Sequence, residues 1–143
     1  MSTRDVFNSS VEVGARIVLL LTGLGRKLDV DELVFFDYAS IYSGDFQGEP
    51  SLHPVLLNRL AELVRRREIF PAAIKFFTSK GLVSSQVDEL GVRYYATKEG
   101  SDFAGKLSSD YHTDFRRRVS WVEANFDNLT AQRSTIYKID RVV

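Results

Sequence analysis

The chain has 143 residues, of which 44% are apolar and 27% charged, and its formal net charge is zero. This composition is ordinary for a soluble globular protein, and the length suits one domain with a sizeable core. The absence of cysteine excludes disulfides and thiolate metal sites. Neutral charge weighs against a free-standing nucleic-acid binder, because such domains are usually strongly basic. No signal-peptide pattern or long apolar run is present, so we expect a cytoplasmic protein without metal or cofactor.

Two helices are predicted in the first third of the chain. Asn8 or Ser9 can cap the first, with Glu12 completing a capping-box pattern, and the helix should run to Leu24. Apart from Arg16 this segment is apolar on nearly every side, which is typical of a central, buried helix. The second helix should begin at Asp29 or Asp31 and reach about Tyr42.

Two residues break the apolar stripe of the second helix. Asp37 lies one turn from Leu33 and one turn from Ile41, so we expect a carboxylate at the core edge that is hydrogen-bonded to an arginine. Phe36 falls on the polar side, where it either packs against a second internal surface or forms a partner-binding hot spot. The internal packing surface is the favoured interpretation.

A loop is predicted over residues 43–54, because glycine and proline interrupt any regular pattern there. Ser43, Asp45 and His53 share this loop and superficially suggest a nucleophile, an acid and a base. Their spacing matches no catalytic arrangement, and turn formation explains each of them. We therefore expect no enzymatic activity.

The third helix should follow Pro54, with Leu60, Leu63 and Val64 inside, and a further helix should reach Lys80. Pro71 favours a break between them at residues 67–70. Arg65, Arg66 and Arg67 precede this break; they form either a solvated face or a contact to phosphate or to an acidic protein surface.

A β-hairpin is predicted between two helices, residues 82–87 pairing antiparallel with residues 92–97. Gly81 ends the preceding helix, Gly91 completes the turn, and Thr97 caps the following helix. This order is typical of the wing of a winged helix-turn-helix domain. The predicted fold class is therefore mainly α (α+β), with one hairpin wing and C-terminal helices.

The C-terminal part is predicted to be helical. Ser109 or Asp110 should cap a helix whose apolar residues recur at near-heptad spacing, and Thr130 should cap a last one. On the first of these two helices, Arg116, Arg117 and Arg118 should lie on the solvated side. We expect residues 1–107 to form the winged-helix-like domain and residues 108–143 an extension packed on it.

A protein-binding surface is predicted where the acidic, aromatic loop 43–54 approaches the arginine run. In this hypothesis Phe46 is a central anchor, with Asp45, Arg66 and Arg67 around it. The alternative places Phe46 in the core beneath the second helix. The full set of candidate partner-binding residues is Phe36, Asp45, Phe46, His53, Arg65, Arg66 and Arg67.

Several segments in order resemble the small middle component of ABC-three-component systems, the group that includes Lamassu-type antiviral operons. They are the start at Phe7, the Ser-Gly-Asp and Ser-Leu-His-Pro pieces of loop 43–54, the Gly-Leu-Val entry to the hairpin, and the Trp121-Val122 helix. The resemblance implies a non-catalytic adaptor that binds an SMC/Rad50-like ATPase and controls an effector, often a nuclease. A DNA-binding winged-helix transcription regulator is the alternative function.

Overall fold

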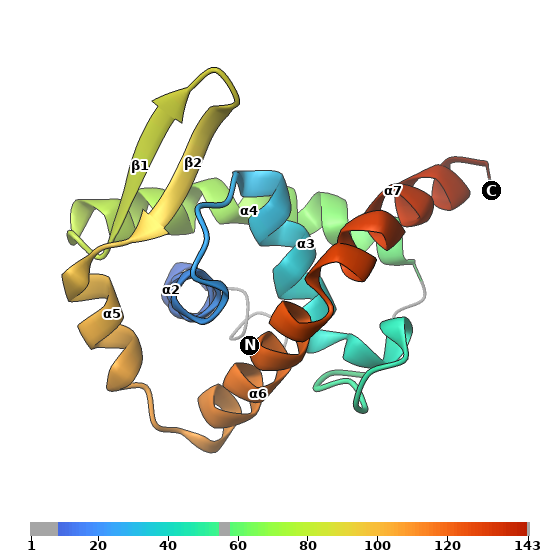
Figure 1. The fold of residues 1–143 in the computed structure, drawn as a ribbon, viewed down its shortest axis with the longest axis horizontal. Coiled ribbons are helices and arrows are strands. Elements are labelled where there is room, and N and C mark those ends of the chain that lie inside the picture. The colour runs from blue at the N-terminus through green and yellow to red at the C-terminus, as the bar shows by residue number, and fades with distance from the viewer. Residues whose placement is uncertain (1–8, 55–57, 143) are drawn as a thin grey trace.

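The computed structural model describes residues 9–54 and 58–142, with side chains up to residue 135, as a helical body from which one hairpin projects (Figure 1). In chain order the elements are α2 (Ser10–Leu24), α3 (Val30–Ile41), the 3-10 turn η1 (Ser43–Phe46), α4 (Arg59–Ser79), β1 (Val83–Asp88), β2 (Gly91–Ala96), α5 (Lys98–Gly105), α6 (Asp110–Ala124) and α7 (Phe126–Val142). The mainly α class with one antiparallel hairpin is confirmed. No helix in the described ranges has the length and apolar content needed to cross a membrane.

Helix α2 is the central element of the body. It is seen end-on in Figure 1, with α3, α4, α5, α6 and β2 packed around it. The Ser9 hydroxyl accepts a hydrogen bond from the Glu12 N–H at 3.3 Å, and Gly25 ends the helix with a φ of 62°. Its middle is buried on every side, including Arg16. The predicted central helix is therefore confirmed, and Ser9 is its cap.

Helix α3 begins with a reciprocal capping box. The Asp29 carboxylate accepts from the Glu32 N–H at 2.8 Å, and the Glu32 carboxylate accepts from the Asp29 N–H at 3.0 Å. Phe36, on the side predicted to be polar, is buried and stacks on Phe126 at 4.9 Å between ring centroids. The favoured interpretation of Phe36 as internal packing is confirmed, because Phe126 at the start of α7 packs on its ring.

Helix α4 is continuous from Arg59 to Ser79, so the predicted break at residues 67–70 is wrong. Pro71 lies inside the helix, where it removes one backbone hydrogen bond. Buried side chains occur on both sides of Pro71, among them Leu63, Phe70 and Phe77. Their packing holds both halves against the body, and this offsets the roughly 3 kcal/mol that an interior proline costs a helix.

The hairpin has the predicted register, with Val83 opposite Ala96 and Val87 opposite Val92. Gly91 adopts a φ of 105°, which a residue with a Cβ rarely adopts, and this closes the turn. The Thr97 hydroxyl accepts from the Gly100 N–H at 3.0 Å and so caps α5. A short bridge also joins Leu28, between α2 and α3, to Tyr94 in β2. This bridge fixes the hairpin base to the helical body.

The C-terminal helices contribute to the same core as α2 and α3. Phe115, Val119 and Val122 of α6 are buried. Arg118 is also buried, at 6% exposure, so the prediction that all three arginines of this run face solvent is wrong for Arg118. Helix α7 begins at Phe126, and Thr130 lies inside it rather than capping it. The division at residue 107 stays a prediction.

Phe46 is only 6% exposed, so the expectation that it is an exposed anchor is wrong. Its ring makes edge-to-face contacts with Phe35 at 5.7 Å and with Tyr38 at 6.0 Å. The 3-10 turn folds the ring back onto α3, as the alternative supposed, because an aromatic side chain gains more from this apolar surface than from water.

Replacing Phe46 with alanine should lower the free energy of unfolding by about 3–5 kcal/mol, because it opens a cavity in the core. The matched control is Phe76→Ala, at a side chain that is 41% exposed, with an expected loss of about 1 kcal/mol. Urea unfolding of both variants measures the difference. Equal losses would show that Phe46 is not a core residue.

Candidate functional site

Four charged side chains from three helices meet in the interior. Arg16 of α2 donates from Nε to Asp37 Oδ1 of α3 at 2.8 Å and from Nη2 to Oδ2 at 3.3 Å. Arg66 of α4 donates from Nε to Asp37 Oδ2 at 3.1 Å, and its Nη1 donates to Glu62 one turn earlier. All four side chains are at most 3% exposed. We call this set the ionic cluster.

The ionic cluster is neutral overall, with two guanidinium groups and two carboxylates in alternation. Burial alone raises the pKa of Asp37, but Arg16 and Arg66 outweigh it and hold that pKa below its ordinary value. Asp37 therefore stays ionised. The predicted pairing of Asp37 with an arginine is confirmed, and a second arginine that the sequence did not indicate also binds it.

His53 and two tyrosines lie beside the ionic cluster. The Tyr111 hydroxyl lies 3.4 Å from His53 Nε2, and the Tyr42 ring packs edge-on against the imidazole at 5.9 Å. Burial, followed by the positive charges of Arg16 and Arg66, lowers the pKa of His53 to about 4. Burial raises the pKa of Tyr111 to about 12. Both groups are therefore neutral at pH 7.

This arrangement is poorly suited to acid–base catalysis at neutral pH, which works best with a pKa near the operating pH. The superficial triad of the loop is not assembled either. Ser43 donates to the Glu49 carbonyl at 2.8 Å, and the Tyr38 hydroxyl donates to Asp45 at 2.5 Å. Among the described residues, no three His, Asp or Glu side chains gather in a way that could hold a metal ion. The ion pairs of the ionic cluster join α2, α3 and α4.

Helix α6 anchors the loop over residues 43–54. Arg118 donates to the Glu49 carboxylate and, at 2.9 Å, to the Pro50 carbonyl. Gly48 lies against Trp121, and a Cβ at Gly48 would approach the indole to 2.6 Å. In the sequence, the only indication of this contact is the glycine within the acidic loop. No spacing between residues indicates that the loop packs on α6. The loop is thus part of the packed body.

The candidate partner-binding residues differ in their burial, and some of them lie in the core. Phe36, Phe46 and Arg66 are buried. Arg67 is exposed and pairs with Asp31 at 2.8 Å, whereas Asp45 and His53 bond to neighbouring aromatic residues. Arg65 is half-buried and lines a depression on α4. A binding role for any of them stays a prediction, but the combined surface centred on Phe46 is not formed.

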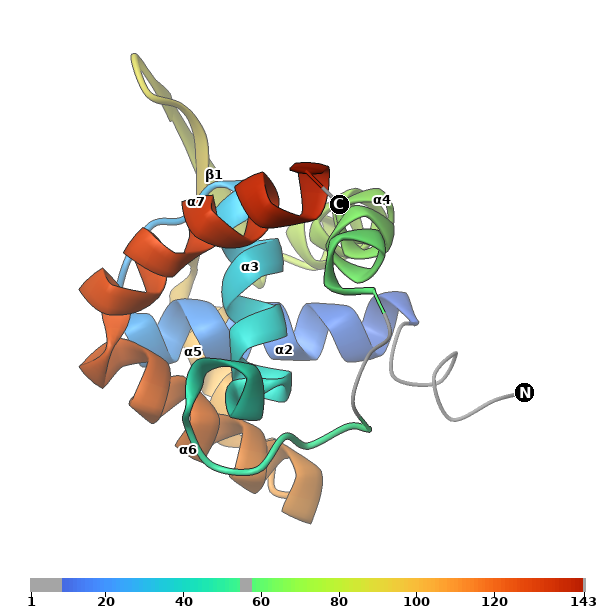
Figure 2. The same ribbon diagram turned by 90° about the vertical axis from the view of Figure 1, so that its right-hand side faces the viewer.

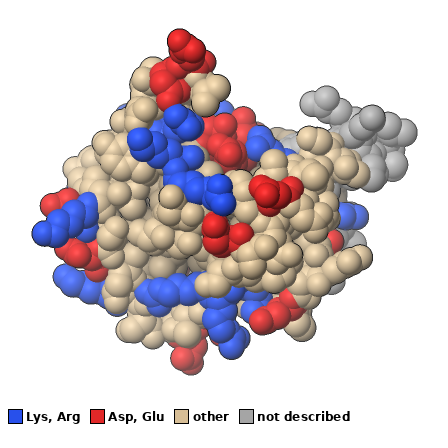
Figure 3. Space-filling view, in the orientation of Figure 1, with Lys and Arg blue, Asp and Glu red and all other residues tan. Residues whose placement is uncertain are grey.

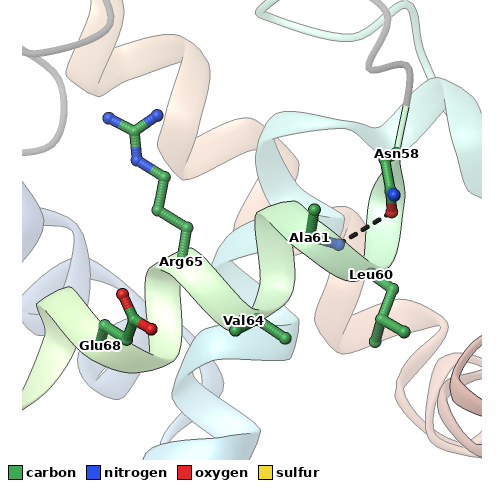
Figure 4. Close-up of a pocket in the computed structure, with 6 residues that line it drawn as sticks. All are labelled: Asn58, Leu60, Ala61, Val64, Arg65 and Glu68. Atoms are coloured by element: carbon green, nitrogen blue, oxygen red, sulfur yellow. Dashed lines mark hydrogen bonds between the residues drawn. The ribbon is translucent and has the colours of Figure 1, made fainter.

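The outer side of α4 carries a shallow depression of about 440 Å³ that sequence reasoning missed (Figure 4). It is lined by Asn58, Leu60, Ala61, Val64, Arg65 and Glu68. Val64, expected inside, is 51% exposed here. A second depression of about 400 Å³ adjoins it, with Asp31, Arg67 and Arg133 among its lining residues, and Val64 and Glu68 line both. The depressions offer an apolar strip with charges of both signs beside it.

Neutralising Asp37 should be strongly destabilising, because it leaves two buried guanidinium groups facing one remaining carboxylate. Asp37→Asn is expected to cost about 3–5 kcal/mol of unfolding free energy. Asp31→Asn is the matched control: its ion pair with Arg67 is about half exposed, so the loss should stay below about 1 kcal/mol. Chemical denaturation measures the free energy of unfolding of each variant. Similar losses of this free energy in the two variants would contradict a structural role of the ionic cluster.

Acidification should destabilise the protein through His53. The unfolded imidazole takes up a proton near its ordinary pKa of 6.5, whereas the folded one does so only near 4. Stability is therefore intact above pH 6.5 and falls as the pH drops toward 4. His53→Gln should flatten this part of the stability curve.

His112→Gln is the comparison for that experiment. Burial also lowers the pKa of His112, the second histidine of the chain, so this variant shows how much of the slope belongs to it. Melting temperatures from pH 7.5 to 4 provide the measurement. An unchanged slope in His53→Gln would contradict the shifted titration.

Comparison with known proteins gives a family match over nearly the whole chain. A family model described as ABC-three component (ABC-3C) system Middle Component 2 matches residues 6–139. No curated protein and no solved structure shows significant similarity. The match includes the three helices that hold the ionic cluster, the hairpin, α6 and most of α7. The chain belongs to the Middle Component 2 family of ABC-three component systems.

Proposed function

We propose that this chain is a non-catalytic adaptor subunit of a cytoplasmic bacterial anti-phage defence complex of the Lamassu type. In this proposal it binds an SMC/Rad50-like ATPase and controls an effector nuclease. The observation that carries the proposal is the family match over residues 6–139, because a middle component belongs to a system with other subunits.

The chemistry of the interior supports an adaptor. The charged groups of the ionic cluster pair with one another, and His53 and Tyr111 titrate far from neutral pH. The surface, in contrast, carries the depressions on α4 and several exposed apolar side chains. Proteins that work by binding partners use such apolar strips with charges at their borders.

The order of elements supports a winged-helix-like architecture as part of this proposal. The elements follow one another as in a winged helix-turn-helix: α2, the Leu28 bridge to β2, α3, α4 and then the β1–β2 hairpin. Helix α4 then corresponds to the recognition helix and the hairpin to the wing. The same topology is the specific observation that favours the second candidate function, a DNA-binding transcription regulator.

The residues on α4 and the wing favour the adaptor. The second half of α4, with the residue after it (residues 69–80), includes no Asn, Gln or Arg, the side chains that best read base edges, and in the first half Arg66 is buried. Acidic side chains lie at the wing tip (Figure 3), where they would repel phosphate.

Co-expression of this chain with the ATPase and effector of its own operon tests the proposal. The tagged chain should retain at least one of them on an affinity column and through gel filtration. A chain that elutes alone under low salt would contradict the adaptor function.

Duplex binding distinguishes the alternative. The isolated chain should show no salt-dependent binding to a short DNA duplex at roughly micromolar protein concentration. Tight binding to a specific duplex without partners would favour the transcription regulator.

A further inference from the structure

The hairpin has two faces of different character. Val83, Ala96 and Tyr94 belong to one face, since they alternate along the strands, and all three pack into or against the core. Continuing outward, the next register pair on this face is Val87 opposite Val92. The apolar face that covers the core at the base of the hairpin therefore extends beyond the core toward the tip.

No described part of the chain covers this outer section. Val87 is 75% exposed, Val92 43%, and Leu90 in the turn 77%. These three are half of the large apolar side chains exposed in the described part of the chain, the others being Val11, Val64 and Phe76. Both ribbon views show the hairpin projecting past the helices (Figures 1 and 2). We call Val87, Leu90 and Val92 the tip patch.

The opposite face of the hairpin is already occupied by interactions within the chain. Lys27 donates to Gln86 and lies 5.5 Å from the Tyr95 ring centroid. Arg93 pairs with Asp88 across the strands. The polar face thus holds the hairpin in position against the α2–α3 connection. An element held in place while its apolar face stays uncovered is preorganised for binding, which lowers the entropy cost of association.

Charge indicates what covers the tip patch. Glu89 lies in the turn beside Leu90 and is exposed, and no ion pair joins it to any described residue. Acidic side chains are visible at this tip in Figure 3. A DNA backbone would be repelled, and two copies meeting tip to tip would bring their Glu89 side chains together. A protein surface with lysine or arginine beside apolar side chains complements both features.

We propose that the tip patch is the docking surface for another protein subunit of the three-component complex, one that offers an apolar groove bordered by basic side chains. Val87 and Val92 fill the groove, and Leu90 adds an apolar contact at the turn. Glu89 pairs with the basic side chains at the border of the groove. This inference rests on the proposed adaptor function and assigns a surface to it.

The test measures binding of the purified chain to the ATPase and the effector of its operon, each immobilised in turn. The double variant V87T/V92T keeps the β-branched shape that strands favour and replaces one methyl of each valine by hydroxyl. It should weaken binding to one of the two subunits about tenfold or more, as expected for central apolar contacts. V11T makes the same change at a side chain that is 55% exposed on α2 and should leave affinity unchanged.

Charge reversal gives an independent readout. E89K should slow association several-fold at low salt, and the difference from the unmodified chain should shrink as salt rises. Melting temperatures of all variants should match that of the unmodified chain, because the altered side chains are exposed. If V87T/V92T is folded and binds more weakly, the loss of affinity therefore comes from the changed interface and not from unfolding.

The outcomes separate the two proposals. If the unmodified chain binds a subunit and V87T/V92T binds it equally well, the docking role of the tip patch is overturned while the adaptor function stands. If the unmodified chain binds neither subunit, both are overturned. Loss of self-association or of duplex binding in V87T/V92T, with subunit binding unchanged, would assign the tip patch to a second copy or to DNA and overturn the inference.

Discussion

Buried ion pairs of the ionic cluster, Arg16, Asp37, Arg66 and Glu62, hold α2, α3 and α4 together. One charge comes from α2, one from α3 and two from α4, so each of the three helices must present its residue at the correct rotation and height. Burying such charges is costly, and apolar residues of similar size could be equally stabilising. A misaligned packing, however, would leave a buried charge without its counterion. We infer that the cluster selects one arrangement of the helices.

That arrangement determines where the surrounding elements lie. With α2, α3 and α4 fixed, Phe36 meets Phe126, and Phe46 folds under the 3-10 turn onto α3. Arg118 and Trp121 of α6 then hold the loop over residues 43–54. The bridge between Leu28 and Tyr94 ties the hairpin to the connection between α2 and α3. The polar interior and the hairpin are thus linked through the first two helices.

These features together suit a protein whose function lies at its surface. The charges inside are neutralised by one another, and the groups beside them do not titrate near pH 7. The outer side of α4 and the tip patch remain as apolar surfaces that no described part of the chain covers. The adaptor function proposed above, with two partner subunits, would need at least two such surfaces, and α4 and the tip lie on different elements.

Most of the local structure could be predicted from the amino-acid sequence. The caps at Ser9, Asp29 and Thr97, the hairpin register and the burial of α2 follow from hydrogen-bonding side chains and short-range periodicity, which act within a few residues. The pairing of Asp37 with an arginine was also predictable, because a carboxylate among apolar neighbours needs a counterion. Long-range packing, which the sequence does not show, selects the arginines that pair with Asp37. It also places Phe46 in the core, carries α4 through Pro71 and turns Arg118 inward. Each of these depends on contacts between residues far apart in the chain, whose packing energy outweighs local preference.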